Sequence, residues 1–275
     1  MSKLFTSLTV SLAFAVSVAA APPAKQSADD VPIVPLKTAK LTFFEDFEST
    51  APGEIPKGFT KKGTIAVAEG GAHSGTRALR LDAAKAQSII VKSGQELAAL
   101  GGQYWGRLFF RIQGKPPKSA HATIVFGQAR TPSLNDRMVW NMVDLSVHKD
   151  GGYHFIYSGM FQDRRQEFNG GGKMVPDKFV EEWTLVEWQM DNVAKTYRFF
   201  INGVERQGMA VHPGSKNFER IEFPAVFESM SFGWVSHWGK APDDDGERIV
   251  WIDDIAVGRD RIGDQISQPV TKAKK

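Results

Sequence analysis

Apolar and polar residues alternate with a period of two along several short stretches of the chain, which is typical of strands with one buried face and one polar face. In the stretch from Trp183 to Asp191, Val186, Trp188 and Met190 share one face, and Glu187 and Gln189 lie between them. Glycine, proline, asparagine and aspartate separate these stretches, as they do between strands. The pattern therefore predicts an all-β protein.

Around ten candidate strands follow one another with turn residues at regular spacing, an arrangement typical of two-sheet sandwiches and jelly rolls. Asn202-Gly203 is a strong signal for a hairpin turn. Only Gln95–Leu100 has a helical pattern, and this stretch is short. We therefore expect a two-sheet antiparallel β-sandwich or jelly roll.

The N-terminus has the pattern of a secretory signal peptide. Lys3 is followed by an uncharged stretch from Leu4 to Ala24, and small residues precede a cleavage position before Ala21. An uncleaved anchor helix is the alternative, because the uncharged stretch is long enough to span a membrane. Its serine and threonine residues dilute its apolar character. We expect cleavage, a secreted or periplasmic protein, and no membrane span after cleavage.

The remaining chain is expected to form one domain. Residues 1–20 are the predicted signal peptide, and residues 21–40 form a linker containing four prolines. Residues 41–258 show no break in composition and no internal repeat, so we assign them to one domain. Residues 259–275 form a polar, basic tail. We expect a monomer.

Composition and charge exclude several classes of protein. The chain has no cysteine, which excludes a disulfide scaffold, a thiolate zinc site and a cysteine nucleophile. Its net charge is +3, and its basic residues are scattered rather than interleaved with aromatic residues, so no nucleic-acid partner is expected. The 19 phenylalanines and 7 tryptophans suit either a packed aromatic core or a sugar-binding face. Composition does not choose between these two uses.

Four stretches of sequence, taken in order and spacing, resemble one known family. They are Glu45–Ser49, Ala72–Leu81, Phe199–Val211, and Phe232–Trp234 with Val250–Val257. Together they resemble the concanavalin A-like jelly rolls of the fungal cellulose-induced protein and its bacterial relatives, which are similar to glucuronan lyases, a polysaccharide lyase family. The resemblance covers residues 44 to 258, with a poor match over 128–180. It implies an all-β, concanavalin A-like jelly roll.

The resemblance also implies a calcium ion that ties the first strand to the last. Glu48 stands at the family's ligating glutamate, and Ser74 and Arg77 lie in a loop that supplies further oxygens, in the case of Arg77 through its backbone carbonyl. We favour Asp253 over Asp254 as the second carboxylate. Carboxylate and carbonyl oxygens are the ligands that Ca²⁺ prefers. From the residues alone, Glu48 and Asp253 are better explained as solvated strand ends, and only the resemblance favours the calcium site.

The resemblance to lyases suggests a catalytic set. A polysaccharide lyase needs a group that neutralises the uronate carboxylate, a base for the proton alpha to it, and an acid for the leaving oxygen. We assign His121, which matches a histidine of the family, as base or charge stabiliser, and Arg107 or Arg111 as neutraliser. His237 or Tyr157 is the expected proton partner, although relatives tend to carry tyrosine at position 237. Alternatively, these are ordinary polar residues on solvent-facing strands.

Two further functions compete with an acidic-polysaccharide lyase. The first is a non-catalytic protein that binds a polysaccharide or oligosaccharide, with Asn141 as a polar contact and four tryptophans as stacking platforms, namely Trp105, Trp140, Trp234 and Trp238. The second is a structural or adhesion sandwich without a sugar site. A glycoside hydrolase is not expected, because no strand carries the closely spaced carboxylate pair that its reaction requires.

Overall fold

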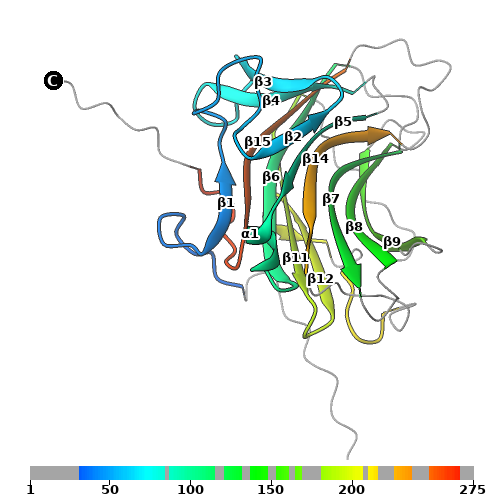
Figure 1. Ribbon diagram of the computed structural model, residues 1–275. Helices are drawn as coiled ribbons and strands as arrows, with labels where there is room; N and C mark the ends of the chain where they lie inside the picture. Colours follow the sequence, from blue (N-terminus) through cyan, green and yellow to red (C-terminus); the bar gives the residue numbers. More distant parts are fainter. Residues whose placement is uncertain are drawn as a thin grey trace, which may run out of the picture.

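The computed structural model shows two antiparallel sheets packed face to face (Figure 1). It describes residues 31–83, 87–114, 121–131, 137–147, 153–160, 165–168, 181–206, 210–215, 226–236 and 248–266. The side chains of β8, β9 and β10 and of the first and last residues of β7 are outside this description, so these positions are placed by backbone register alone. The predicted all-β jelly roll is confirmed.

The first sheet, called sheet A, contains eight strands among the described residues. Their order is β13-β12-β11-β6-β15-β4-β3, and β1 pairs with β15 beside this path. The strands are β1 (Leu41–Glu45), β3 (Ile65–Glu69), β4 (Arg77–Asp82), β6 (Gln103–Gln113), β11 (Thr184–Asp191), β12 (Thr196–Ile201), β13 (Val204–Glu205) and β15 (Ile249–Gly258).

The second sheet, called sheet B, contains seven strands among the described residues, in the order β10-β9-β8-β7-β14-β5-β2. The strands are β2 (Phe59–Lys62), β5 (Gln87–Ser93), β7 (His121–Thr131), β8 (Arg137–Val147), β9 (Tyr153–Met160), β10 (Arg165–Phe168) and β14 (Ser229–Ser236). Helix α1 spans only Gln95–Ala98, within the predicted helical stretch. No described helix is long and apolar enough to cross a membrane.

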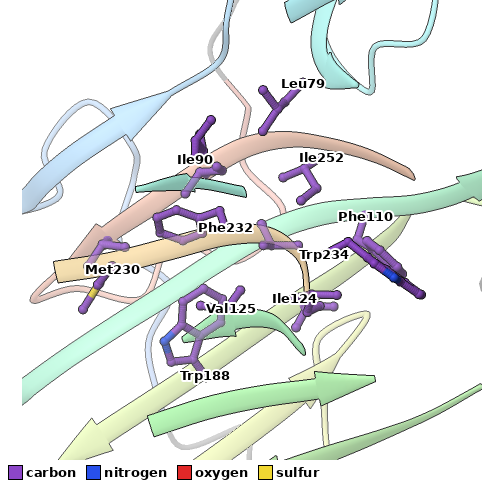
Figure 2. Packing of buried hydrophobic residues seen from close by; sticks show 14 of the residues in the cluster. Leu79, Ile90, Phe110, Ile124, Val125, Trp188, Met230, Phe232, Trp234 and Ile252 are labelled. Atoms are coloured by element: carbon purple, nitrogen blue, oxygen red, sulfur yellow. The ribbon is translucent and has the colours of Figure 1, made fainter. Parts of the chain in front are cut away.

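The hydrophobic core lies between the inner faces of the two sheets. Val186, Trp188 and Met190 are all buried, as their alternation along β11 predicts. Figure 2 shows residues of both sheets packed against one another, including Phe110 from sheet A and Ile124 from sheet B. Burial of this apolar surface is the main stabilising contribution in such a sandwich, because each large buried side chain contributes about 1.5–3 kcal/mol.

A tight turn joins β12 to β13. Asn202 and Gly203 both have positive φ, 49° and 77°, which is the conformation that a two-residue hairpin turn requires at its central positions. The Asn202 side chain accepts a hydrogen bond from the backbone N–H of Leu185 on β11 (2.9 Å). The predicted hairpin is therefore present, and its asparagine also ties the turn to the neighbouring strand.

The folded unit extends beyond the predicted domain limits of 41 and 258. The N–H of Val34 donates to the carbonyl of Arg261 (2.8 Å), and the Gln265 side chain bonds with the backbone of both Leu36 and Val34 (2.8 Å each). Parts of the predicted linker and tail thus lie side by side. The tail residues Arg261 and Ile262 are buried. We call these two segments, residues 31–40 and 259–266, the terminal strap.

Candidate functional site

Arg107 lies on the outer face of sheet A, beneath the terminal strap. Its neighbours Leu108 and Phe110 point into the core, so Arg107 points away from sheet B. It is only 2% exposed, and its Nη1 donates to the carbonyl of Gly263 in the strap (2.8 Å). Burial lowers the pKa of Arg107 to about 10, although the nearby Asp254 carboxylate acts in the opposite direction.

Arg111 lies four residues further along the same face of β6. Its guanidinium stacks on Trp183 and Trp251, with the central carbon 5.1 and 5.8 Å from the ring centres. Its Nη2 reaches the carbonyl of Gly71 at 3.4 Å. Arg111 therefore packs among the aromatic side chains of sheet A.

The structure does not bring these arginines together with His121. His121 begins β7 of sheet B, whereas Arg107 and Arg111 face outward from sheet A, with the whole hydrophobic core between the two positions. The predicted shared groove is therefore corrected: neither arginine lies beside His121. Strand alternation placed both arginines on one polar face, but it could not show which sheet carries that face.

Two of the predicted stacking tryptophans are buried and cannot present a flat face to a sugar. Trp234 is 1% exposed and belongs to the core between the sheets (Figure 2). Trp105 is 7% exposed on the outer face of sheet A, where Phe200 and the Arg261 guanidinium cover it at 5.4 and 5.5 Å. Both assignments are therefore corrected to packing roles.

The register of sheet B sorts the other predicted residues by face. His121 is paired with Ser146 on β8, and Trp140 on β8 is paired with Gln128 on β7. These positions alternate with Ala122, which is buried in the core, so they lie on the outer face. A bulge at Ile124 preserves this alternation along β7, because Ala122 and Val125 on either side of it are both core residues.

Asn141 and Tyr157 occupy the opposite set of positions. Tyr157 is paired with Val143, which is paired with the core residue Val125, and Asn141 lies two residues from Val143. The register thus separates Asn141 and Tyr157 from the face that holds positions 121 and 140. His237 and Trp238 lie outside the described residues.

The predicted calcium loop is held from one end by two buried carboxylates on β15. Asp253 Oδ2 accepts hydrogen bonds from the N–H groups of His73 (2.8 Å) and Ser74 (3.2 Å). Asp254 accepts from the Ser74 hydroxyl and lies 2.9 Å from His73 Nδ1. Both aspartates are 0% exposed. Burial raises the pKa of Asp253 to about 8, and the adjacent Asp254 carboxylate adds to this effect.

The other end of the loop is held by Glu48. Its carboxylate accepts hydrogen bonds from the N–H groups of Thr76 and Arg77 (2.7 Å each) and from the Thr76 hydroxyl (2.9 Å). Although partial burial acts against it, these bonds lower the pKa of Glu48. In return, Arg77 Nη1 donates to the carbonyls of Glu48 and Thr50 (2.9 and 3.1 Å). Glu48 and Arg77 therefore form a reciprocal hydrogen-bonded clamp.

The fit to calcium differs between the two ends of this loop. At the β15 end, two adjacent buried carboxylates and the Ser74 hydroxyl supply the hard oxygens that Ca²⁺ prefers. Burial and the Asp254 charge, which raise the pKa of Asp253, disfavour its ionised form, and a bound cation would offset this penalty. N–H groups of the loop engage Glu48, as they also engage Asp253, but Glu48 is only partly buried and has no second carboxylate beside it. Within the described ranges, no three His, Asp or Glu side chains converge on one point. Asp253, Asp254 and Ser74 fit the ion best.

Sequence reasoning missed one charged pair. Arg261 forms a bidentate pair with Glu187 on β11, with both N–O distances at 3.0 Å. Both side chains are at most 4% exposed. The alternation along β11 places Glu187 on the polar face of the strand, and Arg261 belongs to the predicted tail. Nothing local in the sequence shows that the terminal strap folds back over this face and pairs the two charges.

Comparisons with known proteins support the fold. No protein-family model matches the chain, and no curated protein matches it. Among solved structures, the chain is similar to the cellulose-induced protein Cip1, with a TM-score of 0.55 and 16% identity over 81% of this chain and 100% of that chain. It is also similar to the alginate lyase Aly36B, with a TM-score of 0.57 and 11% identity over 80% and 97% of the two chains.

A structure of an Aly36B mutant in complex with an alginate trisaccharide gives a TM-score of 0.55 at 10% identity, over 81% of this chain and 99% of that chain. At such identities the likeness shows the fold alone. The chain is therefore a two-sheet jelly roll of the architecture shared by Cip1 and Aly36B. The resemblance expected from the sequence is confirmed at the level of fold.

Proposed function

We propose that this protein acts on an acidic polysaccharide as a lyase, through the outer face of sheet B. The observation that carries the proposal is the strand register, which places His121 and Trp140 on that face. On the outer face of sheet A, Arg107 is buried beneath the terminal strap and Glu187 is paired with the strap residue Arg261. The fold shared with the alginate lyase Aly36B supports this choice of substrate class.

The chemistry fits a histidine at position 121. In β-elimination, a base removes the proton alpha to the uronate carboxylate, a carbon–carbon double bond forms, and the bond to the 4-linked oxygen breaks. The leaving oxygen then takes up a proton. Histidine suits the base role, because its ordinary pKa lies near neutral pH. Because Arg107 and Arg111 lie on the other sheet, a different group must balance the uronate charge.

Replacing His121 tests the proposal directly. We expect His121→Ala to lower the cleavage rate on a polyuronate by about 10²–10⁴-fold, the usual contribution of a general base. The measurement is the ultraviolet absorbance of the unsaturated product against a panel of polyuronates. His212→Ala is the matched control, because His212 is exposed in a loop and should leave the rate unchanged. Equal rates in the two variants would exclude His121 as the base.

Non-catalytic glycan binding is the second candidate function. It is favoured by the separation of Arg107 and Arg111 from His121, which removes the expected charge-neutralising group from the catalytic set. In that case the native protein would be retarded in gels containing polysaccharide and would release no unsaturated product from any polyuronate.

We also propose that calcium binds at the β15 end of the 73–77 loop, held by Asp253, Asp254 and Ser74. A divalent cation there would offset the repulsion between the two buried carboxylates, and binding to the folded state alone raises stability by mass action. We expect EDTA to lower the melting temperature, and added Ca²⁺ to restore it, in the native protein but not in Asp254→Asn. Asparagine is well tolerated at the positive φ of position 254. A melting temperature unmoved by EDTA would count against the ion.

A further inference from the structure

Arg111 and Trp183 lie beside one another on the outer face of sheet A. The core residues Phe110 and Ile112 flank Arg111 along β6, so the Arg111 side chain points out of the sandwich. Trp183 immediately precedes β11, whose first residue pairs with Phe110, and this register places Trp183 opposite Arg111. Both residues are partly exposed. We call them the Arg111–Trp183 patch.

Aromatic side chains hold both members of the patch in fixed positions. The Arg111 guanidinium lies over the rings of Trp183 and Trp251, with its central carbon 5.1 and 5.8 Å from the two ring centres. The His73 ring meets Trp183 at 68°, with 5.6 Å between ring centres, and itself stacks on Phe109 at 3.5 Å. The patch is therefore arranged before any ligand arrives, which lowers the entropic cost of binding.

Arg111 has no acidic partner within the described ranges. Its Nη2 reaches only the carbonyl of Gly71, at 3.4 Å, and its Nε is buried without a hydrogen-bond partner among the residues that the structure describes. Arg198, on β12 of the same sheet, instead forms a bidentate pair with Glu205 at 3.0 and 2.6 Å. Burying a charged donor without a partner is costly, so an acceptor supplied by a ligand would stabilise Arg111.

We infer that the Arg111–Trp183 patch is a binding subsite for the carboxylated sugar of an acidic polysaccharide. A guanidinium binds a carboxylate through two parallel N–H···O bonds, and a tryptophan beside it offers a flat apolar surface to the sugar ring. The charge favours a uronate over a neutral sugar, and the ring favours it over a small anion. The patch lies on the sheet opposite the proposed catalytic face, so this inference does not depend on the lyase reaction.

The tryptophan indole N–H signals in a two-dimensional NMR spectrum test the subsite at its own position. The chain has 7 tryptophans, and the signal of Trp183 is the one that Trp183→Phe removes. The His121→Ala protein is used, so that the probe, an alginate tetrasaccharide, remains intact if the proposed lyase reaction occurs. We expect the tetrasaccharide to shift the Trp183 signal, and cellotetraose, which has no carboxylate, to leave it unchanged.

Variants of Arg111 test the carboxylate contact. We expect Arg111→Gln to lower the affinity, read from the Trp183 signal, by about 10–100-fold, since a hydrogen bond to a charged group contributes about 1.5–3 kcal/mol. Arg111→Lys keeps the charge but loses the fork of parallel donors, so its affinity should also fall. Arg80→Gln is the matched control, because Arg80 is exposed on β4 of the same sheet and the change removes an equal charge. It should leave the affinity unchanged, and a melting curve for each variant shows that it is folded.

The outcomes separate this subsite from the proposed lyase. A Trp183 signal unmoved by the alginate probe, or moved as far by cellotetraose, would overturn the uronate subsite, as would unchanged affinity in Arg111→Gln. Tighter binding of a sulfated cello-oligosaccharide would overturn its assignment to a carboxylate. A shifted Trp183 signal in a protein that cleaves no polyuronate would support the subsite and reject only the proposed reaction, whereas cleavage with an unmoved Trp183 signal would do the reverse.

Discussion

Arg261→Ala is expected to destabilise the protein by about 3–5 kcal/mol, measured by urea unfolding, because it leaves the Glu187 carboxylate buried without its bidentate partner. The Arg261 side chain is 4% exposed and that of Glu187 1% exposed. The Arg261 guanidinium also lies 4.2 Å from the centre of the Phe200 ring, so its removal opens space against apolar surface as well. An effect of this size at a position in the predicted tail would show that the terminal strap is part of the folded domain.

Two further variants serve as controls for Arg261→Ala. Arg130→Ala breaks a pair of the same chemistry, with an N–O distance of 3.0 Å to Glu228, but both partners are largely exposed, so the cost should be about 0–1 kcal/mol. The double variant Glu187→Leu with Arg261→Met removes both charges and should recover most of the lost stability. If Arg261→Ala and Arg130→Ala had equal effects, the strap would not be packed as described.

Trp234→Ala is expected to cost about 3–5 kcal/mol of stability, the usual range when a large buried aromatic residue is truncated. Trp234 is 1% exposed between the two sheets, so the substitution leaves a cavity in the core (Figure 2). Its effect on glycan binding should follow only from the loss of folded protein. Urea unfolding, with binding measured under conditions where the variant remains folded, separates the two effects.

Trp140→Ala should behave in the opposite way. Position 140 is paired with Gln128 on the outer face of sheet B, so we expect little change in the free energy of unfolding. Glycan affinity should fall by about 2 kcal/mol, the typical cost of removing a tryptophan that anchors an interface. A Trp140→Ala protein that binds polysaccharide normally would remove the main aromatic contact from the proposed site.

Much of the fold was predictable because strand alternation is local. The buried set Val186, Trp188 and Met190 follows from the period of two along β11, and the Asn202-Gly203 turn follows from the positive φ values that its two residues tolerate. Likewise, the 73–77 loop could be assigned to the neighbourhood of Glu48 and Asp253 through the family resemblance. These features depend on residues close in sequence or on motifs in a fixed order.

The site was only partly predictable, because alternation gives two faces but does not show what covers each. Arg107, Glu187 and Trp105 have the pattern of an outer face, and they do lie on one, yet the strap buries them. Trp234 illustrates the reverse case, since an aromatic residue on a strand suits a core as well as a sugar platform. Contacts between residues far apart in sequence decide the first case, as between Arg107 and Gly263, and the pairing of β14 with β5 and β7 decides the second.

The sequence by itself determined that this chain is a cysteine-free, all-β sandwich, because the period of two and the turn chemistry are local properties. Only the tertiary structure decided which strands share a sheet. Sheet order places the two arginines away from His121, and strand register separates positions 121 and 140 from positions 141 and 157. The physical reason is that pairing between distant strands, rather than the pattern within one strand, selects which polar residues meet.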